Sequence, residues 1–171
     1  MEKPYRELVK MLATPEGWLQ AYPLLRQAGG AAVPDVIAGL AHRDPKIRKW
    51  CAAFFDRHAA KEAVPAIIRA LDDPSAEARR HAVHAIGCQP CKLDPLPIDV
   101  VAELIRKAAQ DESIRVRRAA VHLLGLQGHD PRTVAALEKI LKTESDRKLL
   151  SNAHYALAEQ RKERRRDKRR A

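Results

Sequence analysis

A nine-residue pattern occurs twice in this chain of 171 residues. Residues 79–87 read Arg-Arg-His-Ala-Val-His-Ala-Ile-Gly, and residues 117–125 read Arg-Arg-Ala-Ala-Val-His-Leu-Leu-Gly. Related segments stand 31 residues before the first copy, at Arg48, and 33 residues after Val116, at Leu149. The two copies themselves are 38 residues apart. Repeats of this length are typical of stacked helical hairpins, in which each unit packs mainly against its neighbours.

Each repeat is predicted to consist of two helices joined by a tight turn. The first helix has apolar residues at every third or fourth position, which is the spacing of a helix with one buried face. Such segments are 33–40, 64–71, 100–105 and 134–141. The second helix follows an acidic or hydroxyl residue, which caps a helix by accepting backbone N–H groups. These residues are Asp44, Asp73, Asp111, and Ser145 with Asp146.

The predicted fold is therefore all-α: a right-handed α-solenoid, or superhelix, of about five helical hairpins. The hairpins are expected near residues 4–29, 31–60, 62–91, 97–128 and 131–160. Together they form one array over residues 1–160, and residues 161–171 form a basic tail. The longest step between repeats is explained by an insertion at 89–97, because its three prolines cannot continue a helix.

The second helices carry a pattern that resembles the HEAT repeat. The pattern is Asp-Pro-x-x-x-Ala-Arg-x-x-Ala-x-x-Ala-Ile-Gly at residues 73–87, and it returns in shorter form at residues 116–125. More narrowly, it resembles the bacterial subtype named after phycobilisome lyases, over roughly residues 31–160. The resemblance implies a scaffold or binding surface. A few proteins with such repeats are bilin lyase subunits or DNA glycosylases.

The net charge of +10 is concentrated at the C-terminal end. Residues 161–171 hold eight basic and two acidic residues. The basic residues are Arg161, Lys162, Arg164, Arg165, Arg166, Lys168, Arg169 and Arg170. Such a block is either a solvated extension of the last helix or disordered. It can attract phosphate groups or an acidic partner by releasing counterions.

The chain shows no secretory signal and no membrane-length apolar stretch, so a cytoplasmic protein without membrane contact is expected. Its three cysteines do not form an even disulfide framework. Cys51 aligns with Ala82 in the repeat and is predicted to be a small core residue.

Positions in the second helices can be sorted into columns that run from repeat to repeat. In HEAT-like arrays the second helices generally line the concave surface, so the columns facing away from the core form a candidate binding face. These residues are Lys49, Trp50, Arg80, His81, His84, Arg118, His122 and Tyr155. Cations and flat rings along a strip suit phosphate contacts and base stacking, and they also suit an acidic peptide or protein.

Two kinds of arginine are distinguished within these helices. Arg48, Arg79 and Arg117 occupy the usual arginine position of the HEAT repeat, where the resemblance implies pairing with an Asp or a carbonyl of the adjacent unit. Arg80 and Arg118, like Lys49, are expected to be free to meet a partner. Trp50 has a second interpretation as the cover of the junction with the first hairpin, and Phe54 with Phe55 is expected to pack in the core.

One cluster has the composition of a metal site. His81, His84, Cys88 and Cys91 lie within eleven residues and supply four N and S ligands, which fits a closed structural zinc site. The alternative is two surface histidines and two loop thiols, because His84 has an equivalent, His122, in a repeat without cysteines. No cofactor other than this zinc ion is expected.

Three functions remain open on the sequence. The preferred one is a non-enzymatic scaffold that holds a protein partner on the concave face. The alternative is nucleic-acid binding through the basic face and the tail. An enzyme of the glycosylase or lyase kind is third, because the sequence has no Gly-rich phosphate loop, nucleophile elbow or paired carboxylates. The sequence leaves the partner's identity and the oligomeric state open.

Overall fold

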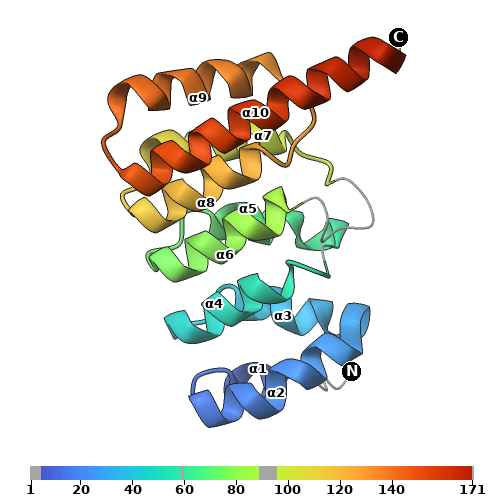
Figure 1. Cartoon of the computed structure of the whole chain (residues 1–171). Coiled ribbons are helices and arrows are strands. Elements are labelled where there is room, and N and C mark those ends of the chain that lie inside the picture. The colour runs from blue at the N-terminus through green and yellow to red at the C-terminus, as the bar shows by residue number, and fades with distance from the viewer. Residues whose placement is uncertain (1–4, 59, 89–95, 171) are drawn as a thin grey trace. The chain divides into compact units, whose positions relative to one another are not determined.

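The computed structural model describes residues 5–58, 60–88 and 96–170, with side chains through residue 167. Within these ranges the chain is helical and contains no strand, as the repeat predicts (Figure 1). It divides into two compact units, Met1–Ile86 with Pro90–Pro97 and Gly87–Gln89 with Ile98–Ala171, here called the N-terminal and C-terminal units. No helix in the described ranges is both long and apolar enough to span a membrane.

The N-terminal unit consists of three helical hairpins. They pair α1 (Arg6–Met11) with α2 (Pro15–Ala28), α3 (Val33–Gly39) with α4 (Pro45–Phe54), and α5 (Val64–Ala70) with α6 (Ala76–Gly87). Short 3₁₀ turns, η1 (Gly29–Ala32) and η2 (Lys61–Ala63), lead into α3 and α5. First helices contact first helices, as α1 does α3, and second helices contact second helices, as α2 does α4. This double layer is the packing of an α-solenoid.

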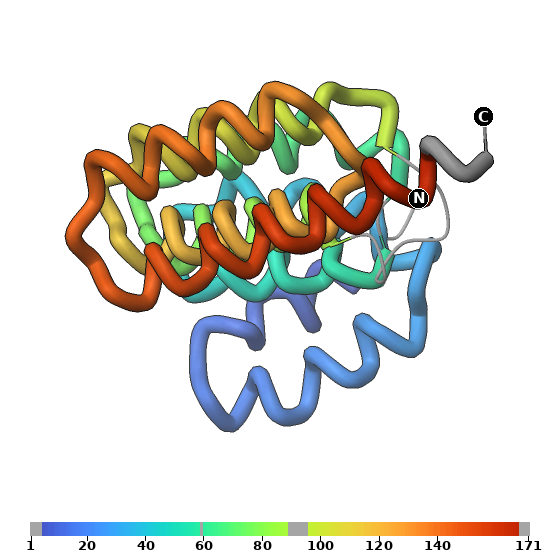
Figure 2. The backbone as a smooth tube through the Cα atoms, turned by 45° about the horizontal axis from the view of Figure 1, so that its top comes forward, coloured from blue at the N-terminus to red at the C-terminus, as the bar shows by residue number. Residues whose placement is uncertain are grey.

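The C-terminal unit repeats the same arrangement with two hairpins. They pair α7 (Val100–Gln110) with α8 (Ile114–Leu124), and α9 (Pro131–Thr143) with α10 (Arg147–Arg170). Helix α7 packs against α9, and α8 packs against α10. Figure 2 shows α9 and α10 running side by side, with α10 continuing well beyond the start of α9. The second helices α8 and α10 therefore form one layer of this unit.

The acidic residues that open the helices act as caps. Asp44 accepts the backbone N–H of Lys46 at 2.8 Å, and Asp146 accepts that of Leu149 at 2.8 Å. Before α8, Asp111 accepts the N–H of Ser113, while Ser113 itself makes no side-chain cap. Each contact satisfies an N–H group that has no partner inside the helix.

The arginines assigned to structural pairing are paired. Arg48 donates to both carboxylate oxygens of Asp73, at 2.6 and 2.9 Å, and so connects α4 to the turn of the next hairpin. Arg79 is 5% exposed and donates to the backbone carbonyl of Asp73 at 2.8 Å. Arg117 lies 3.3 Å from Glu144 of the following hairpin. Pairing with the adjacent unit is confirmed for Arg48 and Arg117, whereas the carbonyl that Arg79 meets belongs to its own hairpin.

The core contains the small and aromatic residues that the repeat alignment places there. Ala82, Val83 and Ile86 of α6 are buried, and so is Cys51. Phe54 and Phe55 are also fully buried, and their rings meet edge to face at 5.4 Å between centroids. Small residues at many of these positions allow the helix layers to approach closely.

The glycine that ends each copy of the nine-residue pattern lies where two helices approach closely. A Cβ atom on Gly125 would stand 2.9 Å from the Cα of Ala156 on α10. A Cβ on Gly87 would stand 2.9 Å from the Cβ of Leu123 on α8. Both distances are shorter than carbon atoms tolerate, so the glycines are required by packing rather than by backbone conformation.

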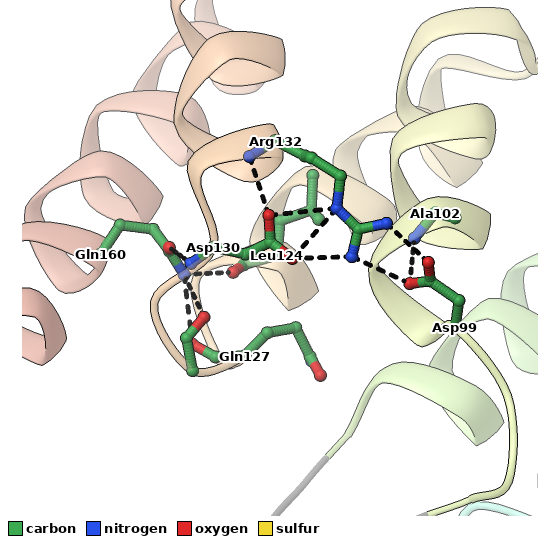
Figure 3. A network of polar contacts seen from close by, with 8 residues as sticks. Asp99, Ala102, Leu124, Gln127, Asp130, Arg132 and Gln160 are labelled. Atoms are coloured by element: carbon green, nitrogen blue, oxygen red, sulfur yellow. Dashed lines mark hydrogen bonds and ion pairs between the residues drawn. The ribbon is translucent and has the colours of Figure 1, made fainter. Parts of the chain in front are cut away.

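A network of polar side chains connects the ends of the helices in the C-terminal unit (Figure 3). The buried amide of Gln127 donates to the carbonyls of Gly87 and Leu123, at 2.7 and 2.9 Å. Gln160, which is fully buried, donates to three carbonyls and accepts the N–H of Asp130 at 2.9 Å. These bonds supply partners to backbone carbonyls at and just beyond the ends of α6 and α8.

Arg132 joins the caps of α7 and α9 at the edge of this network (Figure 3). Its guanidinium lies 2.5 Å from Asp99 and 2.7 Å from Asp130. Asp99 also accepts the N–H of Ala102, and Asp130 accepts that of Arg132 itself. One cation therefore connects two N-cap carboxylates on neighbouring first helices.

Candidate functional site

Half-buried rings line the second helices of the N-terminal unit. The indole of Trp50 on α4 stacks on Trp18 of α2, with centroids 4.6 Å apart, and Tyr22 lies 5.5 Å from the same indole. On its other side Trp50 is 6.1 Å from the imidazole of His81 on α6. We call Trp18, Tyr22, Trp50 and His81 the ring row. It runs across three successive second helices and places Trp50 at the junction with the first hairpin, as the second interpretation of this residue predicts.

The two candidate cations beside the ring row already have local contacts. The ammonium of Lys49 stands 4.3 Å from the centroid of the Trp50 ring, which is a cation–π contact. Arg80 lies 3.2 Å from Glu77 and 3.1 Å from the Nε2 atom of His81. Burial by itself raises the pKa of Glu77, but Arg80 outweighs that effect and lowers it. Arg80 therefore has a carboxylate partner on its own helix, and the expectation that it is free is wrong.

Asp56, which follows α4, places its carboxylate beside two histidines of α6. One carboxylate oxygen lies 3.0 Å from Nδ1 of His84, and the other lies 4.0 Å from Nδ1 of His81. Burial raises the pKa of Asp56, but the two histidines outweigh it and hold this pKa below its ordinary value. The side chain of His84 remains 39% exposed, so it is the accessible member of the group.

Arg118 in the C-terminal unit differs from its prediction. Its guanidinium makes two hydrogen bonds to Asp146, at 2.9 and 2.5 Å, and its carbonyl accepts the side-chain amide of Asn152. The expectation that Arg118 is free is therefore wrong. The reason is that Asp146, the cap of α10, lies one repeat further along the chain and comes within reach when α10 packs on α8. The same bond raises the pKa of Arg118.

His122 and Tyr155 form an exposed pair in the C-terminal unit. Their rings are stacked with centroids 5.9 Å apart and an angle of 19° between the planes. The residues come from α8 and α10 and belong to one predicted column. Tyr155 is 46% exposed, which is unusual for so large an apolar surface. This pair offers a flat surface on the second-helix layer of its unit.

The predicted metal ligands are only partly described. His81 and His84 share one face of α6, whereas Cys88 is 6% exposed and thus buried. Cys91 lies outside the described residues. Among the residues that are described, no group of three or more His, Cys, Asp or Glu side chains is placed to hold a metal ion. The zinc site remains a prediction, because one of its four ligands is not described.

The basic residues after position 160 continue the last helix. Helix α10 runs from Arg147 to Arg170 without a break, so the extension predicted for the tail is helical. Lys162 pairs with Glu159 at 2.6 Å, and Arg166 pairs with Glu163. The side chains of Lys168, Arg169 and Arg170 lie outside the described part. Exposed pairs of this kind contribute little to stability.

Three members of the site were not predicted. Trp18 had a usable signal, because the chain has only two tryptophans, Trp18 and Trp50, and they stand 32 residues apart, one repeat length. That spacing places both rings at equivalent positions of neighbouring second helices. Tyr22 follows from it only as the residue one helical turn after Trp18. Asp56 had no such signal, since it follows the end of α4 in a turn without a repeated pattern.

Comparisons with known proteins agree with the repeat architecture. A family model described as HEAT repeats matches residues 33–98 and 94–158. The structure of the complex of CpcE and CpcF of phycocyanin lyase from Nostoc sp. PCC7120 is similar, with a TM-score of 0.75 and 19% identity, over 89% of this chain and 96% of that chain. A designed armadillo repeat protein aligns with a TM-score of 0.37 and 18% identity, over 91% and 99% of the two chains. No curated protein matches the sequence.

The match to the HEAT-repeat model covers most of the chain and includes the second helices that carry the ring row residues Trp50 and His81. The similarity to the phycocyanin lyase complex concerns the fold, and it agrees with the narrower resemblance seen in the repeat pattern. The chain belongs to the family of HEAT-repeat proteins.

Proposed function

We propose that this protein is a non-enzymatic scaffold that holds a protein partner on its second-helix layers. The ring row carries this proposal. It presents half-buried flat side chains from three successive helices, and aromatic residues are enriched at the centres of protein interfaces. In the C-terminal unit, the exposed His122–Tyr155 stack offers the same kind of surface.

The family and the similar fold support a role in protein association. HEAT arrays present extended surfaces made of repeated helices, and such surfaces suit elongated partners. The similar solved structure is itself a complex of two chains, CpcE and CpcF. In the present chain the N-terminal unit would contribute Lys49, Trp50, Arg80, His81 and His84 to binding, and the C-terminal unit would contribute Arg118, His122 and Tyr155 on its own second-helix layer.

The charges around the rings favour protein over nucleic acid. Nucleic-acid binding depends on cations that can replace counterions at phosphates. Arg80 is paired with Glu77, and Arg118 is paired with Asp146. These cations are already neutralised, so the second helices offer mixed polar and aromatic contacts. The basic extension of α10 is the part of the chain that best suits nucleic acid.

Crosslinking from the proposed face tests the function. A photoreactive amino acid replaces Tyr155 in one variant and His84 in another, and the crosslinked protein is identified and then purified. We expect His84→Ala and Tyr155→Ala to weaken binding of that protein, each roughly tenfold, as exposed aromatic contacts at an interface do. Lys139→Ala on α9, an exposed first-helix position, serves as the matched control and leaves binding unchanged.

Titration with duplex and single-stranded DNA at increasing salt tests the alternative. On the scaffold proposal, weak binding at low salt disappears when Arg164, Arg165 and Arg166 are all replaced by Gln. DNA binding that persists in this variant and is lost in His84→Ala would instead assign the second-helix layer to nucleic acid. Measurement of lyase or glycosylase activity on the purified protein addresses the third function.

A further inference from the structure

A cleft of about 610 Å³ lies beside the ring row in the N-terminal unit. Trp18 and Tyr22 of the ring row form part of its wall, and Leu19, Pro23 and Arg26 of α2 form another part. Arg57 and His58, which follow α4, complete the lining together with Gln27 of α2. A volume of this size is within the usual range of sites that receive a ligand or an anchoring side chain.

The rim of the cleft is apolar and uncovered. Leu19, which lines the cleft, is 65% exposed, and Leu24, on the same helix but not part of the cleft lining, is 49% exposed. With Tyr155, they are the large apolar residues that remain exposed among the described residues. An exposed leucine at the edge of an apolar cleft is a suitable contact for a partner that covers it.

The charged side chains that line this cleft are basic. Arg26 and Arg57 are exposed and make no ion pair with the described residues, in contrast to Arg48 and Arg118, which each meet a carboxylate. No acidic side chain lines the cleft. The pKa of His58 is lowered, first by burial and then by the positive charges of Arg26 and Arg57. A neutral His58 leaves the two arginines as the charges that face an occupant.

We propose that this cleft docks an acidic segment of a partner protein, with one apolar side chain inserted between Leu19, Tyr22 and Pro23. Carboxylates on either side of that anchor would face Arg26 and Arg57. The inference rests on the proposed scaffold function and names the chemistry of the partner. The cleft continues directly into the ring row through Trp18, which stacks on Trp50.

Charge complementarity favours this occupant over others. A second copy of the chain carries a net charge of +10 and would bring further cations to the two arginines. An apolar partner without acids would cover the leucines and leave both guanidinium groups without counter-charges. An acidic segment with an apolar anchor satisfies both features of the cleft, as in the usual combination of apolar centre and polar rim.

Binding of a defined peptide to the full chain tests the inference. The probe is a short fluorescein-labelled peptide in which leucine alternates with glutamate, and binding is followed by fluorescence anisotropy. Two matched peptides replace every glutamate by lysine or every leucine by alanine. We expect the leucine–glutamate peptide to bind, the lysine peptide not to bind, and the alanine peptide to bind less well. Binding should weaken as salt increases, since the arginines are exposed.

Variants locate the peptide on the chain. The double substitution Arg26→Gln with Arg57→Gln should weaken binding roughly fivefold, the effect of removing two exposed ion pairs. Leu19→Gln should weaken it as well, and its high exposure keeps the fold intact. Arg69→Gln on α5 removes the same charge at another exposed position of the unit and should leave binding unchanged. Equal binding by the parent and the double variant overturns the inference.

The crosslinked partner separates this inference from the proposed function. If that partner binds the Arg26→Gln, Arg57→Gln variant as tightly as the parent but loses affinity for His84→Ala, the cleft inference is wrong and the scaffold proposal stands. If neither His84→Ala nor Tyr155→Ala changes its affinity, the second-helix face fails as the binding surface. Loss of affinity in all three variants supports both.

Discussion

Asp73 receives both arms of the Arg48 guanidinium while it also caps the turn before its own helix. Oδ2 accepts from Nε of Arg48 at 2.6 Å, and Oδ1 accepts from a terminal nitrogen at 2.9 Å. Oδ1 also accepts the backbone N–H of Ser75 at 2.7 Å. One nearly buried carboxylate therefore fixes the position of α6 relative to α4.

Replacing Asp73 by Ala should cost more than the loss of a cap. The substitution leaves the Arg48 guanidinium partly buried without its counter-charge, so the free energy of unfolding should fall by about 3 kcal/mol. Asp44→Ala removes a comparable cap without an ion pair of this kind and should cost about 1 kcal/mol. Urea denaturation measures both. Equal losses in the two variants would show that the Arg48 pair contributes nothing.

Gly125→Ala should destabilise the C-terminal unit through a backbone clash. The new Cβ would stand 2.9 Å from the Cα of Ala156, and a backbone atom cannot move aside as a flexible side chain can. We expect a loss of about 2 kcal/mol in unfolding free energy, the usual cost of overpacking. Gly128→Ala is the matched control, because no atom lies within 4 Å of its Cβ position. Thermal denaturation of both variants decides whether the contact or the glycine itself matters.

The pair between Arg118 and Asp146 should make the protein sensitive to acid. The hydrogen bond from Arg118 is the main cause that lowers the pKa of Asp146 from 3.8 to about 2. Because the folded-state pKa lies below the unfolded one, the stability from this group is complete above pH 3.8 and is lost as the pH falls through 2. The difference in stability between the parent and Asp146→Asn should therefore shrink over this interval. A constant difference from pH 5 to pH 2 would contradict the assignment.

The thiol of Cys51 should resist alkylation in the folded protein. Cys51 is fully buried, and burial raises the pKa of its thiol, so the reactive thiolate is scarce and inaccessible. Treatment with iodoacetamide at pH 8, followed by peptide mass spectrometry, should leave Cys51 unmodified. The same treatment in urea provides the control and should modify it fully. Modification of Cys51 without denaturant would mean that α4 opens readily.

The repeat in the sequence predicts the fold well because packing between hairpins is set by local patterns. Apolar spacing defines the helices, and the equivalence of Cys51 and Ala82 places small residues in the core. The arginine position was also predictable, since Arg48 and Arg117 each reach an acid in the turn of the next hairpin, 25 and 27 residues further along the chain. Equivalent positions of the repeat occupy equivalent places in the structure, so a contact in one hairpin predicts the contact in the next.

The surface was less predictable because its pairings depend on residues that do not repeat. Arg118 finds Asp146, whereas its equivalent Arg80 finds Glu77 on its own helix. Asp56 contacts both His81 and His84, and it lies in a turn that has no counterpart in the other repeats. A column of equivalent positions shows which side chains share a face. It does not show which of them are already neutralised by a nearby charge.

Gln127 and Gln160 give the C-terminal unit a further property. Each amide bonds to carbonyls near the end of a second helix, and Gln160 of the last hairpin bonds to the carbonyls of Gln127 and Gly128 in the hairpin before it. Those carbonyls lose their partners whenever the last hairpin undocks, and the exposed groups must then be hydrated. The two hairpins therefore gain order together and lose it together. We therefore expect melting of this unit to be cooperative across its repeats, although each repeat has the helices of a complete hairpin.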